Sequence, residues 1–461
     1  MNAYDLAVIG VGSAGLVAAT SAHRLGLKTV MLEKHKIGGE CTHYGCVPSK
    51  ALINVAKTYR SLHRSSLLGL PEIKLNGNLD FAKVMNHVEG IVNGIYEHEK
   101  PEVFERQGID VMVHPSGARF IDGEHILMGD EKIRAKNTVI CTGSSPRKIN
   151  VPGSEQIDFL HNENFWSIRK LPTSILFVGG GVISAELGQV LAVFGTKVTI
   201  LERNTRILKV LDDDVAEVIT QQFAADGINI ATGCQLKSFE KKNGEIKVTF
   251  EEPDGSEHVK HFEAIFLAAG RVPNIEGMEL KQIGIEHSDR GIVTNNYLQT
   301  SVPHIYACGD VTTQFKFTHT ASHQANICVK NIIDGNSKKN DLSVLPWGIF
   351  TDPEIGHVGL NEKQAREKHD SSISVFRVDA NIDRFITDVK VQGFIKVIFN
   401  KDDKVLGAEA VGSHAGEWIQ LITLVMKHDI PATAMNDTIF SYPTYSEIIK
   451  KVFSRYLRSK A

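Results

Sequence analysis

The chain has 461 residues, 42% of them hydrophobic and 23% charged, and its formal net charge at pH 7 is −3. This length exceeds what one hydrophobic core usually organises, so about two to four domains are expected. The composition is that of an ordinary globular protein, and a charge so close to neutral gives no electrostatic basis for binding nucleic acid or an anionic membrane.

The N-terminal segment does not resemble a secretory signal, because residues 1–5 carry no basic side chain and glycines interrupt the apolar run that follows. The most apolar stretch, residues 175–195, is long enough to span a membrane. It contains Glu186, Gln189 and five glycines, however, which are unfavourable in a helix that faces lipid. We therefore expect a cytoplasmic protein that does not interact with membranes.

The first recognisable unit starts with a strand-like apolar run over residues 5–9, followed by the glycine-rich residues 10–15 (GVGSAG). A helical pattern, a second apolar run over residues 29–32 and Glu33 come next. In a dinucleotide-binding unit the first glycine allows a tight turn, the second lets the backbone approach a pyrophosphate, and the third allows close packing of helix on strand. The helix N-terminus adds positive potential, and the acidic residue can accept hydrogen bonds from a ribose.

A second copy of this pattern follows 169 residues later. Gly179 corresponds to Gly10 and Glu202 to Glu33, while Ser184 stands where the first copy has its third glycine. A single glycine-rich turn occurs in many α/β proteins. Two turns in the same register predict two dinucleotide-binding units.

Cys41 and Cys46 form a closely spaced pair among six cysteines. The other four are isolated, and we expect them to be small buried hydrophobic side chains. The chain therefore lacks the disulfide framework of a secreted protein, and a reducing compartment is expected. In such a compartment a close pair is more naturally catalytic or metal-binding than structural. A helical pattern follows over residues 51–56, and a helix N-terminus favours the reactive thiolate. A zinc half-site that includes His43 and a buried structural pair are the alternatives, although no second ligand cluster follows.

The rest of the chain shows strand periodicity over residues 246–250 and 264–268. The polar residues 334–341 are rich in structure-breaking side chains and mark a domain boundary. Beyond that boundary, a strand-like run over residues 393–399 and a helical pattern over residues 415–428 predict a final α+β domain.

Residues 38–50 (GGECTHYGCVPSK) closely resemble the active-site signature of the class I pyridine nucleotide-disulfide oxidoreductases, the family of dihydrolipoamide dehydrogenase, glutathione reductase and mercuric reductase. Residues 141–146, 270–274 and 305–310 resemble further nucleotide and flavin motifs of that family in the same order, so the likeness covers essentially the whole chain. It implies an α/β fold with two Rossmann-like dinucleotide-binding domains, the NAD domain inserted in the FAD domain, and a C-terminal α+β dimerisation domain. The implied limits are residues 1–150 and 272–340 for the FAD-binding domain, 151–271 for the NAD(P)-binding domain and 341–461 for the interface domain.

The resemblance also implies roles for single residues. Cys46 would lie against the flavin as the charge-transfer thiolate, Cys41 would meet the acceptor, and Lys50 would pair with Glu186 near the flavin. A helix that starts near Thr318 would direct its positive end at the flavin ring. The resemblance implies no resident metal. The cofactor-binding residues that it implies are Gly10, Gly12, Ser13, Ala14, Gly15, Glu33, Gly39, Lys50, Ala118, Thr142, Gly143, Ser144, Gly179, Gly181, Glu186, Glu202, Gly270, Arg271, Asp310, Thr318 and His319.

The motif at residues 441–447 resembles the dimer-interface motif of the family. In the dithiol and disulfide reductases the position of Tyr442 is a histidine, backed by a glutamate that matches Glu447. A phenol with a reference pKa of about 10 is a poor general base at neutral pH, whereas an imidazole at about 6.5 is well suited. Tyrosine at this position resembles mercuric reductase, although this chain has no cysteine after Cys328 and no N-terminal metal-binding domain. The alternative for Tyr442 is an aromatic side chain that merely fills an interface.

We therefore predict a homodimeric enzyme that passes electrons from NAD(P)H through FAD and the Cys41/Cys46 disulfide to a small-molecule or metal-ion acceptor. The alternatives are a dihydrolipoamide dehydrogenase within a 2-oxoacid dehydrogenase complex, and a non-catalytic flavin-binding or scaffolding protein. Glu202 favours NAD because its carboxylate would repel a 2′-phosphate, whereas Arg203 and Arg206 keep NADP open as the alternative.

Overall fold

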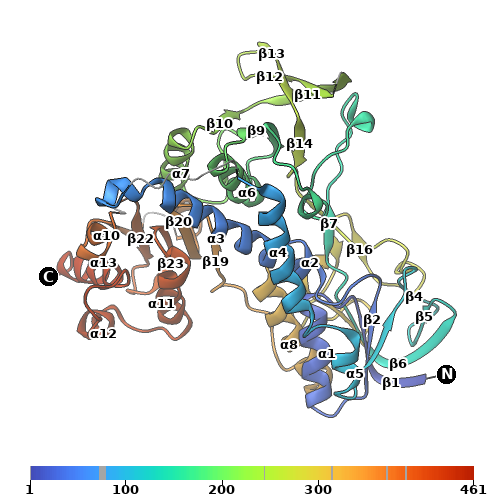
Figure 1. Ribbon diagram of the computed structural model, residues 1–461. Coiled ribbons are helices and arrows are strands. Elements are labelled where there is room, and N and C mark those ends of the chain that lie inside the picture. The colour runs from blue at the N-terminus through green and yellow to red at the C-terminus, as the bar shows by residue number, and fades with distance from the viewer. Residues whose placement is uncertain (1, 72–78, 243, 313–314, 370–371, 390–391) are drawn as a thin grey trace.

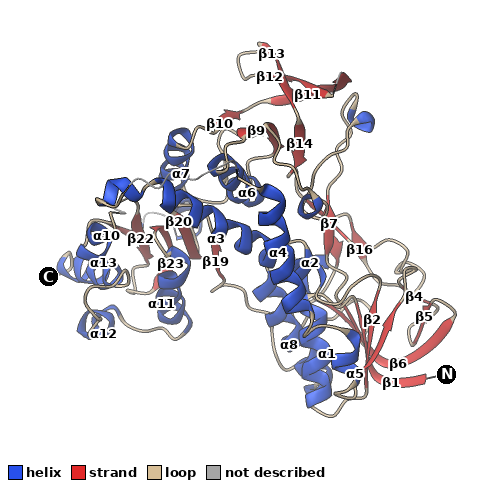
Figure 2. Cartoon of the chain, in the orientation of Figure 1, coloured by secondary structure: helices blue, strands red, loops and turns tan. Residues whose placement is uncertain are grey.

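The computed structural model of the chain describes residues 2–71, 79–242, 244–312, 315–369, 372–389 and 392–461. Its helices and strands are arranged around three main sheets, which belong to the N-terminal, middle and C-terminal parts of the chain (Figures 1 and 2).

The first sheet has seven strands in the order β3-β2-β1-β6-β5-β4, with β18 also paired to β6. Helix α1 (Ser13–Arg24) packs against helix α8 (Thr318–Asp334) beside this sheet. The buried face of α1 consists of four alanines and a glycine, and such small residues let a helix lie close to the strands. The strands are β1 (Asn2–Ile9), β2 (Thr29–Glu33), β3 (Asp110–Val113), β4 (Ala118–Phe120), β5 (His125–Met128), β6 (Glu131–Ile140) and β18 (Ile305–Ala307).

The second sheet has the order β10-β9-β8-β14, and all of its strands are parallel. A separate antiparallel sheet of β11, β12 and β13 projects at the top of Figure 1. The two strands predicted around residues 246–250 and 264–268 are β12 and β14. The elements are β8 (Ser174–Val178), α6 (Val182–Val193), β9 (Lys197–Glu202), α7 (Asp213–Ala225), β10 (Asn229–Thr232), β11 (Gln235–Lys242), β12 (Glu245–Glu251), β13 (Glu257–Phe262) and β14 (Ala264–Leu267).

The apolar stretch at residues 175–195 forms β8 and α6 of this second unit. Among the described residues, no helix combines the length and the apolar character that a membrane span requires.

The chain returns to the first sheet after the second unit, because β18 lies parallel to the C-terminal end of β6. A two-stranded ribbon of β7 (Ser144–Pro146) and β15 (Arg271–Pro273) joins the outgoing and the returning segments. The predicted fold class, with one dinucleotide-binding unit inserted in the other, is therefore confirmed. The residue limits given above for the domains remain a prediction.

The C-terminal part is an antiparallel five-stranded sheet in the order β19-β20-β23-β22-β21, covered by helices. The predicted strand and helix around residues 393–399 and 415–428 are β22 and α11. The elements are β19 (Pro346–Ile349), β20 (Glu354–Gly359), α9 (Glu362–His369), β21 (Ser374–Asp379), α10 (Asp383–Thr387), β22 (Phe394–Phe399), β23 (Val405–Gly412), α11 (Ala415–Lys427), α12 (Ala432–Asp437) and α13 (Glu447–Arg458).

Helix α3 (Cys46–His63) connects the three parts. It packs against α6 of the second unit, and Arg60 near its end pairs with Asp226 at 2.8 Å and with Asp352 at 3.1 Å. Asp226 caps α7, and Asp352 lies just before β20. Because Arg60 is almost buried, this double ion pair fixes the helix that carries Cys46 to both neighbouring units.

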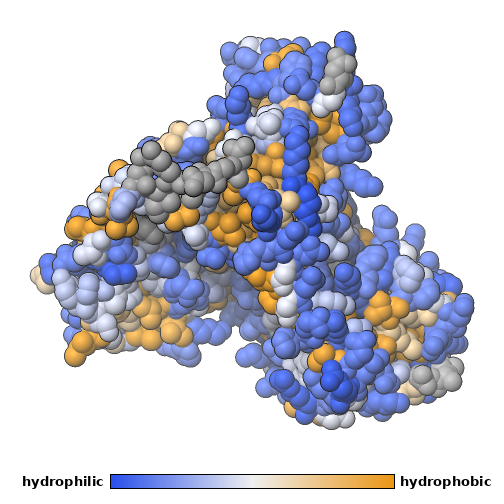
Figure 3. Space-filling model, viewed as in Figure 1, coloured by the Kyte–Doolittle hydropathy of each residue, from blue (hydrophilic) through white to orange (hydrophobic). Residues whose placement is uncertain are grey.

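The remaining elements lie in the connections, and all of them except the 16-residue helix α4 are short. They are α2 (Gly39–His43), η1 (Ser65–Leu68), α4 (Phe81–Tyr96), α5 (Pro101–Glu105), η2 (Ser154–Gln156), η3 (Phe165–Ser167), β16 (His287–Ser288), β17 (Gly291–Ile292) and η4 (Gly309–Val311). In the space-filling view the molecule is hollowed between the C-terminal part and the first unit (Figure 3).

Candidate active site

A cavity of about 2290 Å³ lies where the three parts meet. A typical small-ligand pocket measures roughly 300 to 1,000 Å³, so this cavity has room for more than one nucleotide cofactor. The predicted site residues that line it are Gly10, Gly12, Ser13, Ala14, Glu33, Gly39, Cys41, Cys46, Lys50, Ala118, Thr142, Gly143, Ser144, Glu186, Arg271, Asp310, Thr318 and His319. The predicted residues that do not line it are Gly15, Gly179, Gly181, Glu202, Gly270, Tyr442 and Glu447.

Two glycine turns shape the nucleotide-binding ends of the two units. Gly10 has φ +84°, and a Cβ on Gly15 would lie 2.0 Å from the carbonyl oxygen of Gly10. In the second unit Gly179 has φ +107°, and a Cβ there would lie 2.5 Å from the carbonyl oxygen of Ala268. Neither Gly15 nor Gly179 admits a side chain, so the N-termini of α1 and α6 approach their sheets closely enough to present N–H groups to a phosphate.

Glu33 and Glu202 occupy equivalent places at the ends of β2 and β9, and both are buried. Glu33 accepts hydrogen bonds from the N–H groups of Val11 at 2.6 Å and His35 at 2.8 Å. Glu202 accepts from the N–H group of Gly180 at 2.5 Å. Each carboxylate thus holds the glycine turn of its own unit while lying at the position where a ribose is expected.

Arg206 is occupied within the protein. Its guanidinium donates to the carbonyl oxygens of Leu208 and Leu211 and pairs with Asp213 at 2.7 Å. Arg203 is exposed at the surface.

Cys41 lies in the short helix α2, and Cys46 is the first residue of α3. Both are free thiols, and the Sγ of Cys46 lies 3.5 Å from the hydroxyl oxygen of Thr318. The hydrogen bond between the two thiols lowers the pKa of Cys46 and raises that of Cys41, and the Lys50 ammonium lowers the pKa of Cys46 further. Cys46 is therefore the sulfur that more readily becomes a thiolate.

Among the described residues, no set of further metal ligands lies around Cys41 and Cys46 to support the zinc alternative. Within the described ranges, the one group of three or more metal-ligating side chains is Asp212, Asp214 and Glu409, far from both cysteines in the chain. The ammonium of Lys396 lies 2.7 Å from Asp212 and 2.8 Å from Asp214, so a cation is already supplied there. The Nε2 of His43 donates to the carbonyl oxygen of Ile37 at 2.8 Å instead.

Lys50 and Glu186 join the first two units across the cavity. The Lys50 ammonium lies 2.8 Å from a carboxylate oxygen of Glu186, and Glu186 is buried on α6. The backbone N–H of Phe350 donates to the other Glu186 oxygen at 2.9 Å. A residue of the C-terminal part therefore contributes to this pair.

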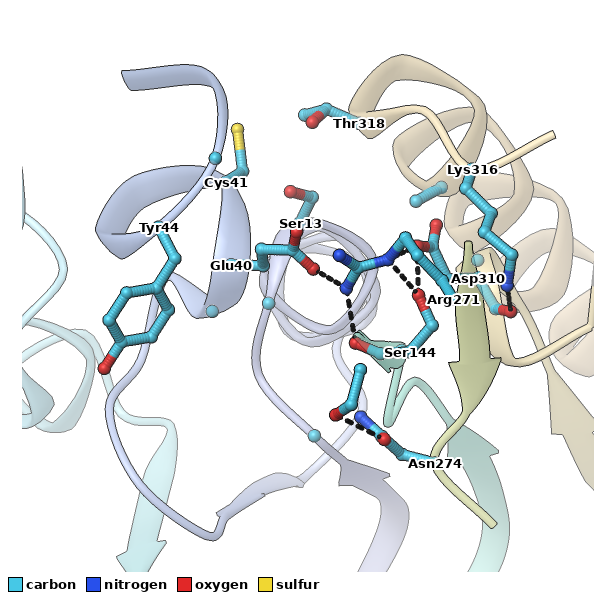
Figure 4. Close-up of a pocket in the computed structure, with 18 of the residues that line it drawn as sticks. Ser13, Glu40, Cys41, Tyr44, Ser144, Arg271, Asn274, Asp310, Lys316 and Thr318 are labelled. Atoms are coloured by element: carbon cyan, nitrogen blue, oxygen red, sulfur yellow. Dashed lines mark hydrogen bonds and ion pairs between the residues drawn. The ribbon is translucent and has the colours of Figure 1, made fainter. Parts of the chain in front are cut away.

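An ion cluster around Arg271 lines the cavity (Figure 4). The guanidinium pairs with Glu40 and donates to the hydroxyl oxygen of Ser144 at 2.8 Å, and that hydroxyl donates to Asp310 at 2.7 Å. Glu40 also accepts from the side-chain amide of Asn162 at 2.7 Å. Burial raises the pKa of Glu40 to about 7, although Arg271 acts in the opposite direction.

The same cluster fits an anionic cofactor. The Nη1 atom of Arg271 is buried and has no hydrogen-bond partner among the described residues. A buried guanidinium nitrogen is rarely left unpaired, so a phosphate of a bound dinucleotide is a suitable partner for it. Together with the glycine turn at Gly10, this nitrogen makes the first unit suited to the pyrophosphate of FAD.

Tyr442 lies outside the cavity and is 71% exposed. Its hydroxyl donates to Asp383 at 2.5 Å, and this hydrogen bond raises the pKa of Tyr442. Glu447 does not contact it in the structure. It accepts from the backbone N–H of Thr444 at 3.1 Å, near the start of α13.

Three residues that contact predicted site residues were not assigned a role from the sequence: Glu40, Phe350 and Asp383. Glu40 stands inside residues 38–50, which were quoted above, but nothing in a motif shows which side chain a residue contacts. Phe350 and Asp383 stand in none of the quoted motifs.

The comparison with known families decides the membership of this chain. The family described as "Pyridine nucleotide-disulphide oxidoreductase" matches residues 4–325, and the dimerisation domain of the same family matches residues 345–453. The chain belongs to the pyridine nucleotide-disulfide oxidoreductases.

The relatives of this oxidoreductase fall into several named kinds. It is 32% identical to mercuric reductase from Staphylococcus aureus over 97% of this chain and 81% of that one. It is 33% identical to dihydrolipoyl dehydrogenase from Bacillus subtilis (strain 168) over 96% of this chain and 94% of that one. Among solved structures, the Cu(II) complex of the HOCl-induced flavoprotein disulfide reductase RclA from Escherichia coli superposes with a TM-score of 0.86 at 25% identity, over 99% and 100% of the two chains.

These findings confirm the predicted enzyme class. The chain is an FAD-dependent disulfide oxidoreductase, members of its family use FAD and NAD(P)H, and its dimerisation domain supports a homodimer. The prediction of a non-catalytic scaffolding protein is not supported. The identity of the acceptor, the cytoplasmic location and the roles of single residues remain predictions.

Proposed function

We propose that this oxidoreductase transfers electrons from NADH, by way of FAD and the Cys41/Cys46 disulfide, to a thiophilic metal ion. Overall, NADH would reduce one mercuric ion to the element and release one proton. The similarity to mercuric reductase supports this acceptor, and the Cu(II) complex of RclA adds cupric ion as a second candidate.

The residues of this chain supply the FAD site as follows. The turn at Gly10 and the free nitrogen of Arg271 would bind the pyrophosphate, Glu33 the adenosine ribose and Asp310 the ribityl chain. The N-terminus of α8 at Thr318 would direct its positive potential at the ring. When bound, FAD takes up hydride from the nicotinamide and makes its two electrons available to the neighbouring disulfide.

The two cysteines would then have different roles. Cys46, whose pKa is lowered, would face the flavin, and Cys41 would be the first sulfur to meet the acceptor. Soft cations bind thiolates strongly, so the reduced pair is suited to hold a metal ion while it accepts electrons.

The observation that carries this proposal is the hydrogen bond from Tyr442 to Asp383. A dithiol or disulfide substrate needs a group that gives and takes protons near pH 7. Tyr442 cannot do so, because its pKa is raised above the usual value of a phenol and Glu447 does not contact it. A metal ion needs no such proton transfer.

Dihydrolipoamide dehydrogenase remains the second candidate, because the similarity to the Bacillus subtilis enzyme extends over almost both whole chains. The hydrogen bond from Tyr442 to Asp383 argues against this second candidate, because a dithiol substrate needs a group that exchanges protons near pH 7.

A panel of acceptors tests the proposed function. Purified holoenzyme would be mixed anaerobically with NADH and with mercuric ion, cupric ion, lipoamide or glutathione disulfide, each over a range of concentrations. We expect kcat/KM for at least one metal ion to exceed that for either disulfide at least about a hundredfold, since a general base at this position typically contributes that much. Rapid reduction of NAD by dihydrolipoamide would instead establish the second candidate and refute the metal-ion proposal.

The structure also predicts which nicotinamide is used. Glu202 would lie at the ribose position, and Arg206 is bound to the protein backbone, so a 2′-phosphate would meet a carboxylate, with the exposed Arg203 as the neighbouring cation in the sequence. We expect NADH to be preferred, and Glu202→Gln to lower the ratio of kcat/KM for NADH to that for NADPH by about tenfold. Glu33→Gln is the matched control, because it removes the equivalent carboxylate of the first unit and should leave this ratio unchanged. An unchanged ratio in Glu202→Gln would contradict the assignment.

A further inference from the structure

Phe350 contacts both members of the Lys50–Glu186 pair. Its ring centroid lies 4.5 Å from the Lys50 ammonium, and its backbone N–H donates to Glu186 at 2.9 Å. All three residues line the cavity. They come from the C-terminal part, from α3 and from α6.

Lys50 needs more than one contact to be held in place. It lies one turn after Cys46 on α3, and its long side chain remains 35% exposed. An ion pair that involves a partly exposed lysine is weak, because water screens the two charges and because holding the long side chain in one position costs conformational entropy. The face of an aromatic ring attracts a cation and restricts it from a second direction, without adding a charge to the site.

Glu186 is held independently of the ring. One of its oxygens accepts from Lys50 and the other from the backbone of Phe350, so the carboxylate is fixed between them. A change of the Phe350 side chain leaves the backbone N–H in place. The contribution of the ring to Lys50 can therefore be tested without removing the hydrogen bond to Glu186.

We propose that Phe350 is a positioning residue, which holds the Lys50 ammonium at the cofactor cavity through the face of its ring. This inference rests on the proposed function and on the place near the flavin that the family resemblance implies for Lys50 and Glu186. Because Phe350 belongs to the C-terminal part, rapid electron transfer from NADH would then depend on how that part is placed against α3.

The first test measures the contact itself in the FAD-free protein. Reductive methylation with ¹³C-formaldehyde labels lysines and keeps their charge. We expect the dimethyl-Lys50 resonance, assigned by its absence in Lys50→Arg, to lie upfield because of the ring current of Phe350. The shift should be lost in Phe350→Leu and retained in Phe350→Tyr. An unshifted resonance in the parent protein would refute the contact, whatever the acceptor of the enzyme proves to be.

The second test measures the consequence in the holoenzyme. In stopped-flow experiments we expect Phe350→Leu to slow flavin reduction by NADH roughly twofold to thirtyfold, the range of a cation–π contact expressed as a rate, and Phe350→Tyr to restore it. Lys57→Met is the matched control, because Lys57 lies on the same helix as Lys50 and forms a similar ion pair with Glu354 of β20, but does not line the main cavity. It should leave the rate unchanged.

A double-mutant cycle separates positioning from packing. Phe350 is half-buried among apolar neighbours, so its replacement also affects packing. If the ring acts through Lys50, Phe350→Leu has no further effect on the rate in a Lys50→Met background. Equal effects in both backgrounds would overturn the proposal. A normal rate in Lys50→Met alone would instead refute the role of Lys50 in the proposed function, while the resonance shift would still report the contact.

Discussion

Replacing Cys46 with serine is expected to abolish both turnover and the long-wavelength absorbance that appears on anaerobic reduction. That absorbance requires a thiolate beside the flavin, and Cys46 is the sulfur whose pKa is lowered, by its hydrogen bond to Cys41 and by Thr318 and Lys50. We expect the rate of metal-ion reduction to fall about a thousandfold or more, as it does when a catalytic nucleophile is removed.

The second cysteine provides the contrast. Cys41→Ser should lose turnover to a similar extent but keep the long-wavelength absorbance, because the Cys46 thiolate remains. Cys234→Ser is the control, since Cys234 is buried in the second unit and does not line the cavity. A band that survives in Cys46→Ser and disappears in Cys41→Ser would reverse the assignment of the two sulfurs.

The second large effect is expected at Gly15. A methyl group there would lie 2.0 Å from the carbonyl oxygen of Gly10 and 3.0 Å from its carbonyl carbon, so the turn must open and α1 must move away from β1. Backbone atoms cannot move aside as a flexible side chain can, and the cost exceeds that of an ordinary overpacked side chain. We expect Gly15→Ala to bind FAD at least about tenfold more weakly, measured by the flavin that remains after gel filtration and by titration of the FAD-free protein.

Gly90→Ala serves as the matched variant for this experiment. Gly90 lies within α4, and an added Cβ meets nothing within 4 Å, so this substitution should leave the flavin content unchanged. If Gly15→Ala also retained full flavin, the first unit would not bind the cofactor through this turn.

The glycine turns and the cysteine segment could be predicted because their chemistry is local. The turn at Gly10 is required by the backbone itself, and its repeat at Gly179 also has a positive φ. Even the departure at Ser184 has a local explanation. Its buried hydroxyl donates to the carbonyl oxygen of Gly179 at 2.5 Å, so a serine closes the turn that Gly15 closes in the first unit.

The partners of the site residues could not be predicted, because they come from distant parts of the chain. Glu40 and Arg271 are 231 positions apart, and Tyr442 and Asp383 are 59 positions apart. The family resemblance pairs Glu447 with the residue at 442, whereas in the structure Glu447 accepts a hydrogen bond from the backbone of Thr444. Contacts of this kind depend on how whole units pack, and no spacing in the sequence reports them.

The central claim is that Cys41 and Cys46 form a disulfide that NADH reduces through FAD, and a count of thiols tests it most directly. The chain has six cysteines, and Cys141 and Cys308 also line the cavity, with their Sγ atoms 3.5 Å apart. Cys308→Ser should therefore show the same change in thiol count as the parent protein if the electrons pass through Cys41 and Cys46. Oxidised holoenzyme would be unfolded without a reductant and titrated with a thiol reagent. Only the four cysteines other than Cys41 and Cys46 should react. After anaerobic addition of NADH the count should rise by the two thiols of the pair, and Cys234→Ser should show the same rise. If all six thiols react before NADH is added, or if NADH bleaches the flavin without changing the count, the two sulfurs do not carry the electrons.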